Sequence, residues 1–209
     1  MRIIAFGCSN TYGHGLEDCW NQQLRAPGPT PSNLAWPALL AKKFNCDVIN
    51  KSSPGASNKL IWQSILDFNF RIDDVCVVLW SYLDRWCVFS DVRTHSLSTW
   101  SLTNKGDKKG KTYYKYVYEE KDHWIMTRSF IYTASSHLKE KGIKNVMCYH
   151  DQFDKQSKYG TLNKYNLNNV SSIDYTYIKR KYPLALDKAH MGPKAHERFA
   201  NIYYKKIGK

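Results

Sequence analysis

Short apolar runs rich in β-branched residues alternate along this chain with longer amphipathic stretches. The apolar runs predict buried strands at residues 2–6, 46–50, 75–81 and 145–149. The amphipathic stretches predict helices at residues 34–44, 59–70, 123–141 and 193–206. Strands that alternate with helices favour right-handed βαβ units, so we expect an α/β fold with a mostly parallel sheet covered on both faces. Functional sites in such sheets lie at the carboxyl ends of the strands.

The length of 209 residues suits one domain with a sizeable core, and we expect a single domain over residues 1–209. Three stretches break the alternation and predict loops over the active face. They are residues 17–33, an insertion at about 84–122 and a long loop at about 151–186. Within the insertion, the lysine- and tyrosine-rich residues 111–118 have strand propensity and predict a hairpin that turns near residues 104–110.

The sequence shows no sign of a membrane span or a metal site. No apolar run approaches the ~18 residues that cross a bilayer, and the first apolar run is too short for a signal peptide, which predicts synthesis in the cytoplasm. Six cysteines form no CxxC pair and no zinc-like spacing, so we expect reduced core thiols. The histidines likewise show no metal-binding spacing, and we expect neither a metal nor a cofactor.

The net charge of +13 comes from 31 lysines and arginines against 18 acidic residues. Such a charge favours contact with polyanions, including nucleic acid, acidic glycans and anionic membrane surfaces. Lysines interleaved with tyrosines over residues 105–121 make a nucleic-acid-binding protein one alternative. No dinucleotide-binding glycine motif, Walker loop or RNA-binding aromatic signature accompanies them. The sequence leaves the oligomeric state open.

Ser9 follows the first predicted strand directly, so its hydroxyl projects from a tight turn where a nucleophile belongs. Near the other end, Asp187 precedes His190 by three residues, a spacing that lets the carboxylate orient the imidazole toward a serine. Taken singly, such a serine more often caps a helix, and the other two residues more often lie on the surface. Their joint placement favours a Ser9, His190 and Asp187 triad.

Residues 50–58 follow the second predicted strand and contain Gly55, where the backbone N–H can approach a substrate oxygen closely. This is a candidate oxyanion loop. A plain connection in which Ser57 or Asn58 caps the next helix is the alternative, and the two roles are compatible.

These blocks carry a family resemblance. Residues 6–11 (FGCSNT), 55–58 (GASN) and 187–190 (DKAH) resemble, in this order, three sequence blocks of the SGNH, or GDSL-like, hydrolases. Residues 34–37 and 191–193, with His196, are similar to small stand-alone members from bacteria and phages.

The resemblance implies a flavodoxin-like three-layer α/β/α sandwich and an esterase without a cofactor. It implies that Ser9 attacks an ester carbonyl, that His190 transfers the proton, and that the backbone amides of Ser9 and Gly55 bind the oxyanion. Because the family often acts on carbohydrates, we expect removal of a short acyl group, acetyl first, from a carbohydrate or similar substrate. A phage-encoded member is also expected to be virion-associated.

Two positions depart from the family pattern. Cys8 stands where the family has aspartate, and its side chain should point away from Ser9. The third block, residues 79–85, lacks the family's glycine and asparagine. Ser81, Asn58 or Arg85 are candidates for the missing oxyanion donor, whose loss typically costs about 10²–10³ in rate. This departure makes a non-catalytic binding module, for example in a virus particle, a second alternative.

The third block also suggests how a substrate is held. Trp80, Tyr82 and Arg85, with Trp86 beside them, would lie where the third strand exits. An aromatic wall with a cation suits a sugar ring or an anionic substrate group. The alternative is a core aromatic cluster with a surface arginine.

Overall fold

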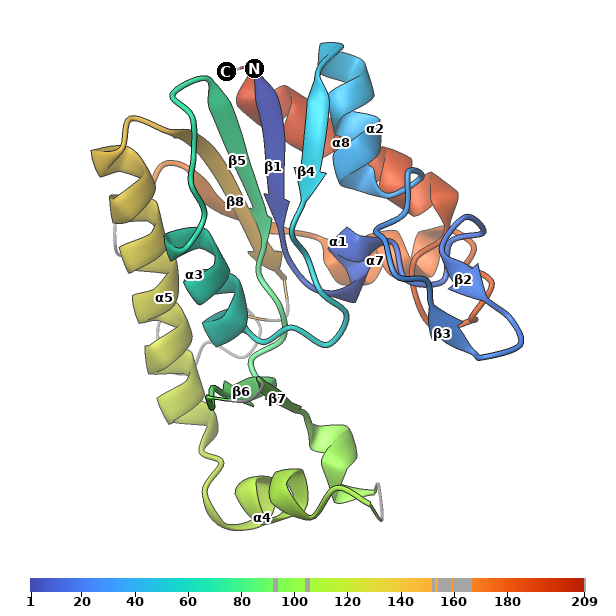
Figure 1. The fold of residues 1–209 in the computed structure, drawn as a ribbon, viewed down its shortest axis with the longest axis vertical. Coiled ribbons are helices and arrows are strands. Elements are labelled where there is room, and N and C mark those ends of the chain that lie inside the picture. The colour runs from blue at the N-terminus through green and yellow to red at the C-terminus, as the bar shows by residue number, and fades with distance from the viewer. Residues whose placement is uncertain (92–93, 104–105, 152, 154–158, 160–166, 209) are drawn as a thin grey trace.

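A parallel five-stranded sheet forms the centre of the computed structural model, which describes residues 1–91, 94–103, 106–151, 153, 159 and 167–208. The strand order is β4–β1–β5–β8–β9, and every neighbouring pair is parallel (Figure 1). The bounds are β1 Arg2–Phe6, β4 Asp47–Asn50, β5 Asp74–Leu79, β8 Lys144–His150 and β9 Val170–Ile173. The four predicted strands are confirmed, with ends that shift by one or two residues.

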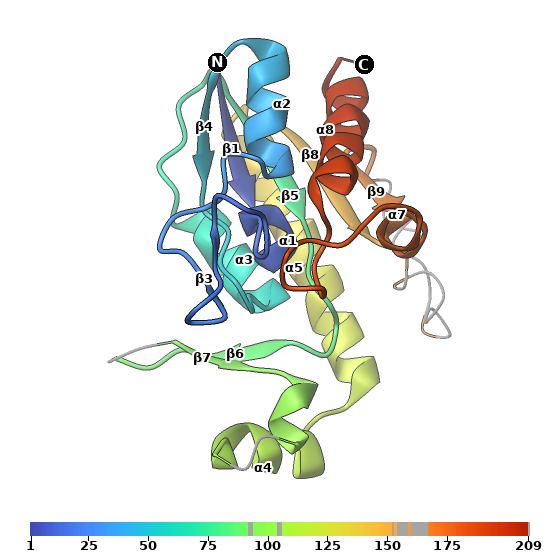
Figure 2. The same ribbon diagram turned by 90° about the vertical axis from the view of Figure 1, so that its right-hand side faces the viewer.

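Helices cover both faces of this sheet. Helices α2 (Trp36–Phe44) and α8 (Pro193–Ile207) lie side by side on one face, and α3 (Asn58–Leu66) and α5 (Glu120–Glu140) cover the other (Figure 2). The expected three-layer α/β/α sandwich is therefore confirmed. Helix α3 ends four residues before the predicted end, and Phe68 and Phe70 pack against the core beyond it.

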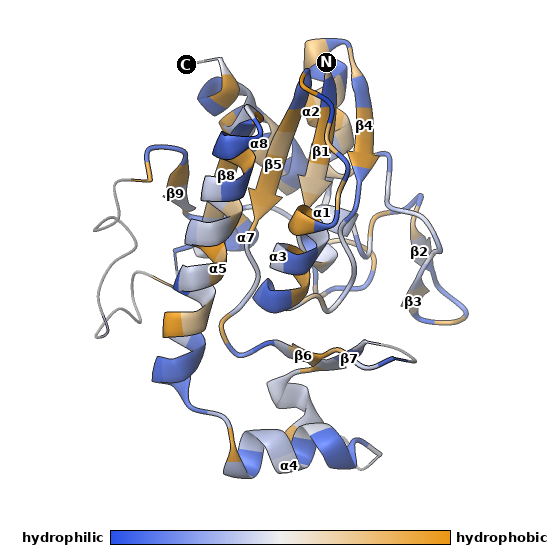
Figure 3. Cartoon of the chain, turned by 60° about the vertical axis from the view of Figure 1, so that its left-hand side comes forward, coloured by the Kyte–Doolittle hydropathy of each residue, from blue (hydrophilic) through white to orange (hydrophobic). Residues whose placement is uncertain are grey.

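The strands bury both faces because their residues alternate with period two. Ile3 of β1 packs in the cluster with α2 and α8, whereas its neighbour Ile4 packs in the cluster with α3 and α5. On the first side, Trp36 of α2 stacks on Tyr203 of α8 with ring centroids 4.2 Å apart. Strands β1 and β5 are accordingly among the most hydrophobic elements in Figure 3. Each fully buried large apolar side chain contributes about 1.5–3 kcal/mol to such a core.

The stretches predicted as loops contain regular structure. In the first of them, β2 (Trp20–Asn21) pairs with β3 (Ala26–Pro27), and the short helix α1 (Ser9–Tyr12) lies ahead of it, just after β1. In the insertion, β6 (Trp86–Val88) pairs antiparallel with β7 (His95–Leu97), and the 3₁₀ helix η1 (Thr99–Leu102) follows. This hairpin lies beyond the carboxyl ends of the main strands (Figure 1).

The predicted hairpin at residues 111–118 is wrong, because most of this segment belongs to helix α4 (Lys108–Tyr116). The Asp107 side chain caps the helix by accepting a hydrogen bond from the Gly110 N–H at 2.9 Å. Gly110 and Tyr114, four residues apart, are buried, and the Tyr114 hydroxyl donates to the Asp84 carbonyl. Helical spacing of the buried positions outweighed the strand propensity of the tyrosines.

The long loop predicted at residues 151–186 is wrong where β9 and helix α7 (Tyr175–Lys181) form. The Asp174 side chain caps α7 by accepting from the Tyr177 N–H at 3.1 Å, a signal that the sequence carries. Residues 152, 154–158 and 160–166 of the predicted loop lie outside the described residues. Within the described part of the chain, no helix combines the length and the apolar character needed to cross a membrane.

Candidate active site

The turn between β1 and α1 places Ser9 at the carboxyl edge of the sheet. A Cβ at Gly7 would overlap the Thr11 side chain and lie 3.1 Å from the Leu79 carbonyl oxygen, so only glycine fits this turn. The Ser9 hydroxyl is buried and has no hydrogen-bond partner among the described residues. The neighbouring Cys8 packs in the core cluster beneath α3 and α5.

A cavity of about 300 Å³ opens at this edge, and both Ser9 and His190 line it. Residues from several parts of the chain complete the wall. They are Asn10 from α1, Tyr82, Asp84 and Arg85 from the β5 exit, Ser98 and Trp100 from the insertion, Tyr175 and Lys179 from α7, and Ala189. The site thus gathers residues from positions 9 to 190 at the ends of parallel strands.

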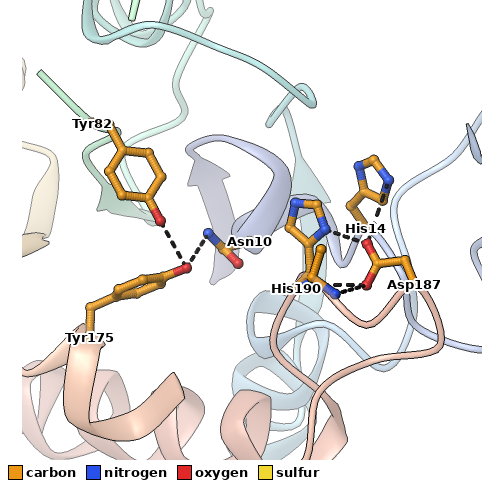
Figure 4. Close-up of polar contacts among 7 residues, drawn as sticks. Asn10, His14, Tyr82, Tyr175, Asp187 and His190 are labelled. Atoms are coloured by element: carbon orange, nitrogen blue, oxygen red, sulfur yellow. Dashed lines mark hydrogen bonds and ion pairs between the residues drawn. The ribbon is translucent and has the colours of Figure 1, made fainter. Parts of the chain in front are cut away.

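His190 is held by Asp187 at one ring nitrogen. The Nδ1 atom of His190 lies 2.5 Å from Oδ2 of Asp187, as Figure 4 shows. Because the carboxylate accepts, Nδ1 carries the proton and Nε2 is the nitrogen left to accept another proton. This is the orientation that a general base for a serine requires.

The Asp187 carboxylate is itself fixed by the backbone. Its Oδ1 accepts hydrogen bonds from the N–H groups of Ala189 and His190, both at 3.0 Å. Burial alone would raise the pKa of Asp187, but these hydrogen bonds and the one from the His190 ring outweigh it and lower the pKa. A Cβ at Gly15 would lie 2.7 Å from this carboxyl group, so the glycine allows the close approach of the two loops.

A second imidazole, that of His14, lies against the first. The rings of His14 and His190 stack at 4.2 Å between centroids with 16° between their planes. Nε2 of His14 is 3.9 Å from Oδ2 of Asp187, and Trp20 covers the other face of His14 (Figure 4 shows the His14–Asp187 contact). Burial, and next the nearby charge of His190, lower the pKa of His14. The neutral form of His14 therefore predominates at neutral pH.

The His14, Asp187 and His190 ligand atoms all lie within 4.8 Å of one another, close enough to hold a metal ion. The sequence did not indicate this group, because its members are not at a metal-binding spacing. An ion bound there would compete with the His190–Asp187 hydrogen bond for the Asp187 carboxylate.

Asn10, Tyr175 and Tyr82 form a hydrogen-bonded chain on the opposite wall of the cavity (Figure 4). The Tyr175 hydroxyl accepts from Asn10 Nδ2 at 3.0 Å and from the Tyr82 hydroxyl at 3.1 Å. Having accepted two hydrogen bonds, the Tyr175 oxygen still has its own proton to donate. Burial raises the pKa of Tyr175 well above its ordinary value, so this proton is retained at neutral pH.

The predicted oxyanion residues are not brought together. Gly55 adopts a φ of 78°, a left-handed conformation that favours glycine. The residue does not line the cavity. The prediction of Asn58 as an oxyanion donor is corrected, because its side chain is bonded elsewhere. Its Nδ2 donates to the Ser81 carbonyl at 3.1 Å and its Oδ1 accepts from the Ser81 N–H at 2.7 Å. Ser81 is fully buried and its Oγ accepts from Arg85 at 3.2 Å. Asn58 and Ser81 thus tie α3 to the β5 exit and face no substrate.

Of the predicted substrate-binding residues, Tyr82 and Arg85 line the cavity and Trp80 does not. Trp80 is fully buried in the cluster beneath α3 and α5, which corrects the prediction for this residue. Alternation along an extended chain would place Trp80 and Tyr82, two residues apart, on the same side, but the chain turns after β5 and separates them. Lys179 and Trp100 were missed because only the folded chain brings them to Ser9, and His14 was missed because only the folded chain stacks it on His190.

The fold is a three-layer sandwich with a serine and a carboxylate-bound histidine at the carboxyl edge of its sheet. No protein-family model matches the sequence, and no curated protein matches it either. Solved structures do match. One is a carbohydrate esterase whose active site displays divergent catalytic and non-catalytic binding functions, with a TM-score of 0.59, 15% identity, and coverage of 100% of this chain and 68% of that chain.

Two further matches come from named bacteria. An acetyl xylan esterase from the rumen bacterium Butyrivibrio proteoclasticus matches with a TM-score of 0.58 and 15% identity, over 99% of this chain and 62% of that chain. A protein of the G-D-S-L family from Desulfitobacterium hafniense DCB-2 matches with a TM-score of 0.57 and 11% identity, over 98% of both chains. At these identities the likeness shows a common fold, and it is the fold that the sequence resemblance implied.

Proposed function

We propose that this protein is a serine esterase that removes a short acyl group, acetyl in the first instance, from a carbohydrate. One observation carries the proposal: His190 is bound to Asp187 through Nδ1, and it lines the same cavity as the unpartnered Ser9 hydroxyl. The carbohydrate esterases among the proteins of the same fold support the choice of substrate.

In the proposed reaction, Ser9 Oγ attacks the carbonyl carbon of the ester and its proton passes to Nε2 of His190. Asp187 stabilises the resulting imidazolium. The tetrahedral intermediate then collapses, the carbon–oxygen bond to the sugar breaks, and the sugar hydroxyl leaves with the proton from His190. Water repeats the sequence on the acyl-enzyme, which releases the carboxylic acid and restores the Ser9 hydroxyl.

The oxyanion needs preorganised donors, and losing one typically costs about 10²–10³ in rate. The backbone N–H of Ser9 is one donor that the family resemblance implies, whereas Gly55, the other, does not line the cavity. We add the Tyr175 hydroxyl, which lines the cavity with a proton left to donate. It would take over the task that a third-block asparagine performs in the family.

A non-catalytic binding module is the second candidate. It is favoured by two observations: no hydrogen bond joins Ser9 Oγ to His190, and Asn58 is fully engaged with Ser81. Catalytic hydrogen bonds often tighten only when substrate binds, so the first observation is compatible with both candidates. The second leaves the oxyanion site without the family's amide donor.

A fluorophosphonate probe and a short-chain aryl ester distinguish the two candidates. The wild-type protein should be labelled on Ser9 and should release acid from the ester, and both signals should disappear in Ser9→Ala and fall at least ~10³-fold in His190→Ala. Ser129→Ala is the matched control, because this exposed serine on α5 bonds only its own helix.

Labelling and turnover that persist in Ser9→Ala would refute the esterase. A folded wild-type protein that binds acetylated oligosaccharide, but is neither labelled nor active, would establish the binding module instead.

A further inference from the structure

Arg85 is a buried cation that faces the candidate active site. Its side chain lines the cavity although the residue is only 6% exposed. Nη1 donates to Ser81 Oγ at 3.2 Å, and the guanidinium lies over the rings of Tyr82 at 4.9 Å and Trp100 at 5.6 Å. No carboxylate of the described residues forms an ion pair with it. A guanidinium has five N–H donors, so most of them remain for a ligand.

Lys179, from helix α7, is a second cation in the wall of the same cavity. The one carboxylate in that wall, Asp84, accepts a hydrogen bond from Thr99 at 2.7 Å. Beneath the wall, His150 is neutral at neutral pH and adds no charge of its own. Burial, and next the positive charge of Arg85, lower the pKa of His150 to about 3. With Arg85 and Lys179 set against Asp84, the described wall of the cavity carries an excess of positive charge next to Ser9, and Arg85 itself is buried.

The hollow continues away from Ser9 along α7. A neighbouring depression of about 520 Å³ shares Tyr82, Tyr175 and Lys179 with the first cavity and adds Arg180 and Tyr182. Tyrosine and tryptophan faces suit sugar rings, whereas arginine and lysine suit anionic oxygens. The two adjoining hollows therefore combine the groups that suit more than one unit of an acidic oligosaccharide.

From this arrangement we propose that the ester substrate is an acidic carbohydrate whose carboxylate binds Arg85 and Lys179 while its acyl ester lies at Ser9. The inference rests on the proposed esterase and names its substrate class. A planar carboxylate matches the fork of a guanidinium, which favours it over a neutral hydroxyl group. Further acidic units would extend past Arg180.

Two substrates that differ only in the carboxylate provide the test: an O-acetyl methyl glucuronide and the matching O-acetyl methyl glucoside. We expect kcat/KM of the wild-type protein to be about 10- to 100-fold higher for the glucuronide, chiefly through KM, because a charge-assisted hydrogen bond is formed only there. This preference should fall as salt is added.

Arg85→Met should reduce the preference to about twofold or less, and Lys179→Met should reduce it partly. Lys181→Met is the matched control, because Lys181 lies on the same helix but lines neither hollow. Labelling of Ser9 by the small fluorophosphonate probe should survive in Arg85→Met, which shows that the variant is folded. Arg85→Lys should restore part of the preference.

Equal kcat/KM for the two substrates would overturn the inference and leave the esterase intact. Absence of both turnover and Ser9 labelling would instead overturn the proposed function. Oligogalacturonate should inhibit hydrolysis of the glucuronide competitively. If single-stranded DNA inhibits and oligogalacturonate does not, the cations serve a nucleic acid and the inference is wrong.

Discussion

The exits of β1 and β5 lie side by side at the carboxyl edge of the sheet, but their polar groups are used in opposite ways. After β1, the Ser9 hydroxyl and the Asn10 side-chain oxygen are buried without partners among the described residues. After β5, Ser81 is bound to Asn58 through its backbone and to Arg85 through its hydroxyl. The first exit keeps hydrogen-bonding capacity for a substrate, and the second uses most of it to hold the site in shape.

Substitution of Tyr175 tests whether its hydroxyl supplies the oxyanion donor that the third sequence block lacks. Tyr175→Phe should lower kcat by about 10²–10³ with little change in KM, because the hydroxyl is proposed to bond the oxyanion. Tyr82→Phe is the matched control, since it removes the other hydroxyl of the pair but leaves the Tyr175 proton. Steady-state kinetics on the aryl ester measure both. Equal, small losses in the two variants would remove Tyr175 from the oxyanion site.

Substitution of Asn58 tests whether the polar groups after β5 serve to hold the site in shape. Asn58→Ala leaves the buried Ser81 N–H and carbonyl without partners, so we expect a loss of about 2–3 kcal/mol in unfolding free energy. For a chain of this length that lowers Tm by roughly 5–10 °C. The kcat of the folded variant should stay within about threefold of wild type. Gln63→Ala, a change at a half-buried residue of the same helix whose side chain makes an exposed hydrogen bond to Asp67, should leave Tm nearly unchanged. A large fall in the kcat of Asn58→Ala at constant Tm would contradict the structural role of Asn58.

His150, the last residue of β8 and in ring contact with Tyr82 after β5, tests how this edge of the sheet responds to acid. It is fully buried, stacks on Tyr175 at 4.1 Å and has a pKa lowered to about 3, first by burial. An unfolded histidine, with a pKa near 6.5, binds a proton that the folded one does not. The stability contribution is therefore complete above pH 6.5 and is lost as the pH falls toward 3.

Urea unfolding between pH 6 and pH 4 measures this loss. His150→Phe keeps the ring stack and removes the titration, so the slope of unfolding free energy against pH should decrease by about 1.4 kcal/mol per pH unit. His196, with a pKa near 4, remains in the variant and should maintain part of the slope. An unchanged slope would show that His150 does not titrate as proposed.

Much of the fold was predictable because its elements are local. The apolar runs and helical spacings placed four strands and four helices, and the first turn after β1 placed Ser9 at the carboxyl edge. The Asp187–His190 hydrogen bond follows from three-residue spacing in one loop, which sequence can show. The helix α4 was missed because the burial of Tyr114 depends on a partner 30 residues away, the Asp84 carbonyl.

The rest of the site depends on long-range contacts. Tyr175 and Asn10 are hydrogen-bonded although they lie 165 residues apart, and their spacing in the sequence does not predict this contact. Trp80 and Tyr82 are equivalent in sequence terms, and only the turn after β5 sends one into the core and the other to the cavity. His14 follows Ser9 by five residues, so its proximity to Ser9 was readable, but its stack on His190 was not.

The insertion supplies Ser98 and Trp100 to the cavity, while its β6–β7 hairpin pairs with no strand of the main sheet. The segment that supplies these two wall residues is therefore separate from the main sheet and from the loops that carry Ser9, Asp187 and His190. Exchange of this module between homologous chains would let substrate preference diversify while the reactive groups stay in place. Protein engineering can use the same route, because loop grafting at residues 86–102 would change the substrate preference without redesign of the rest of the protein.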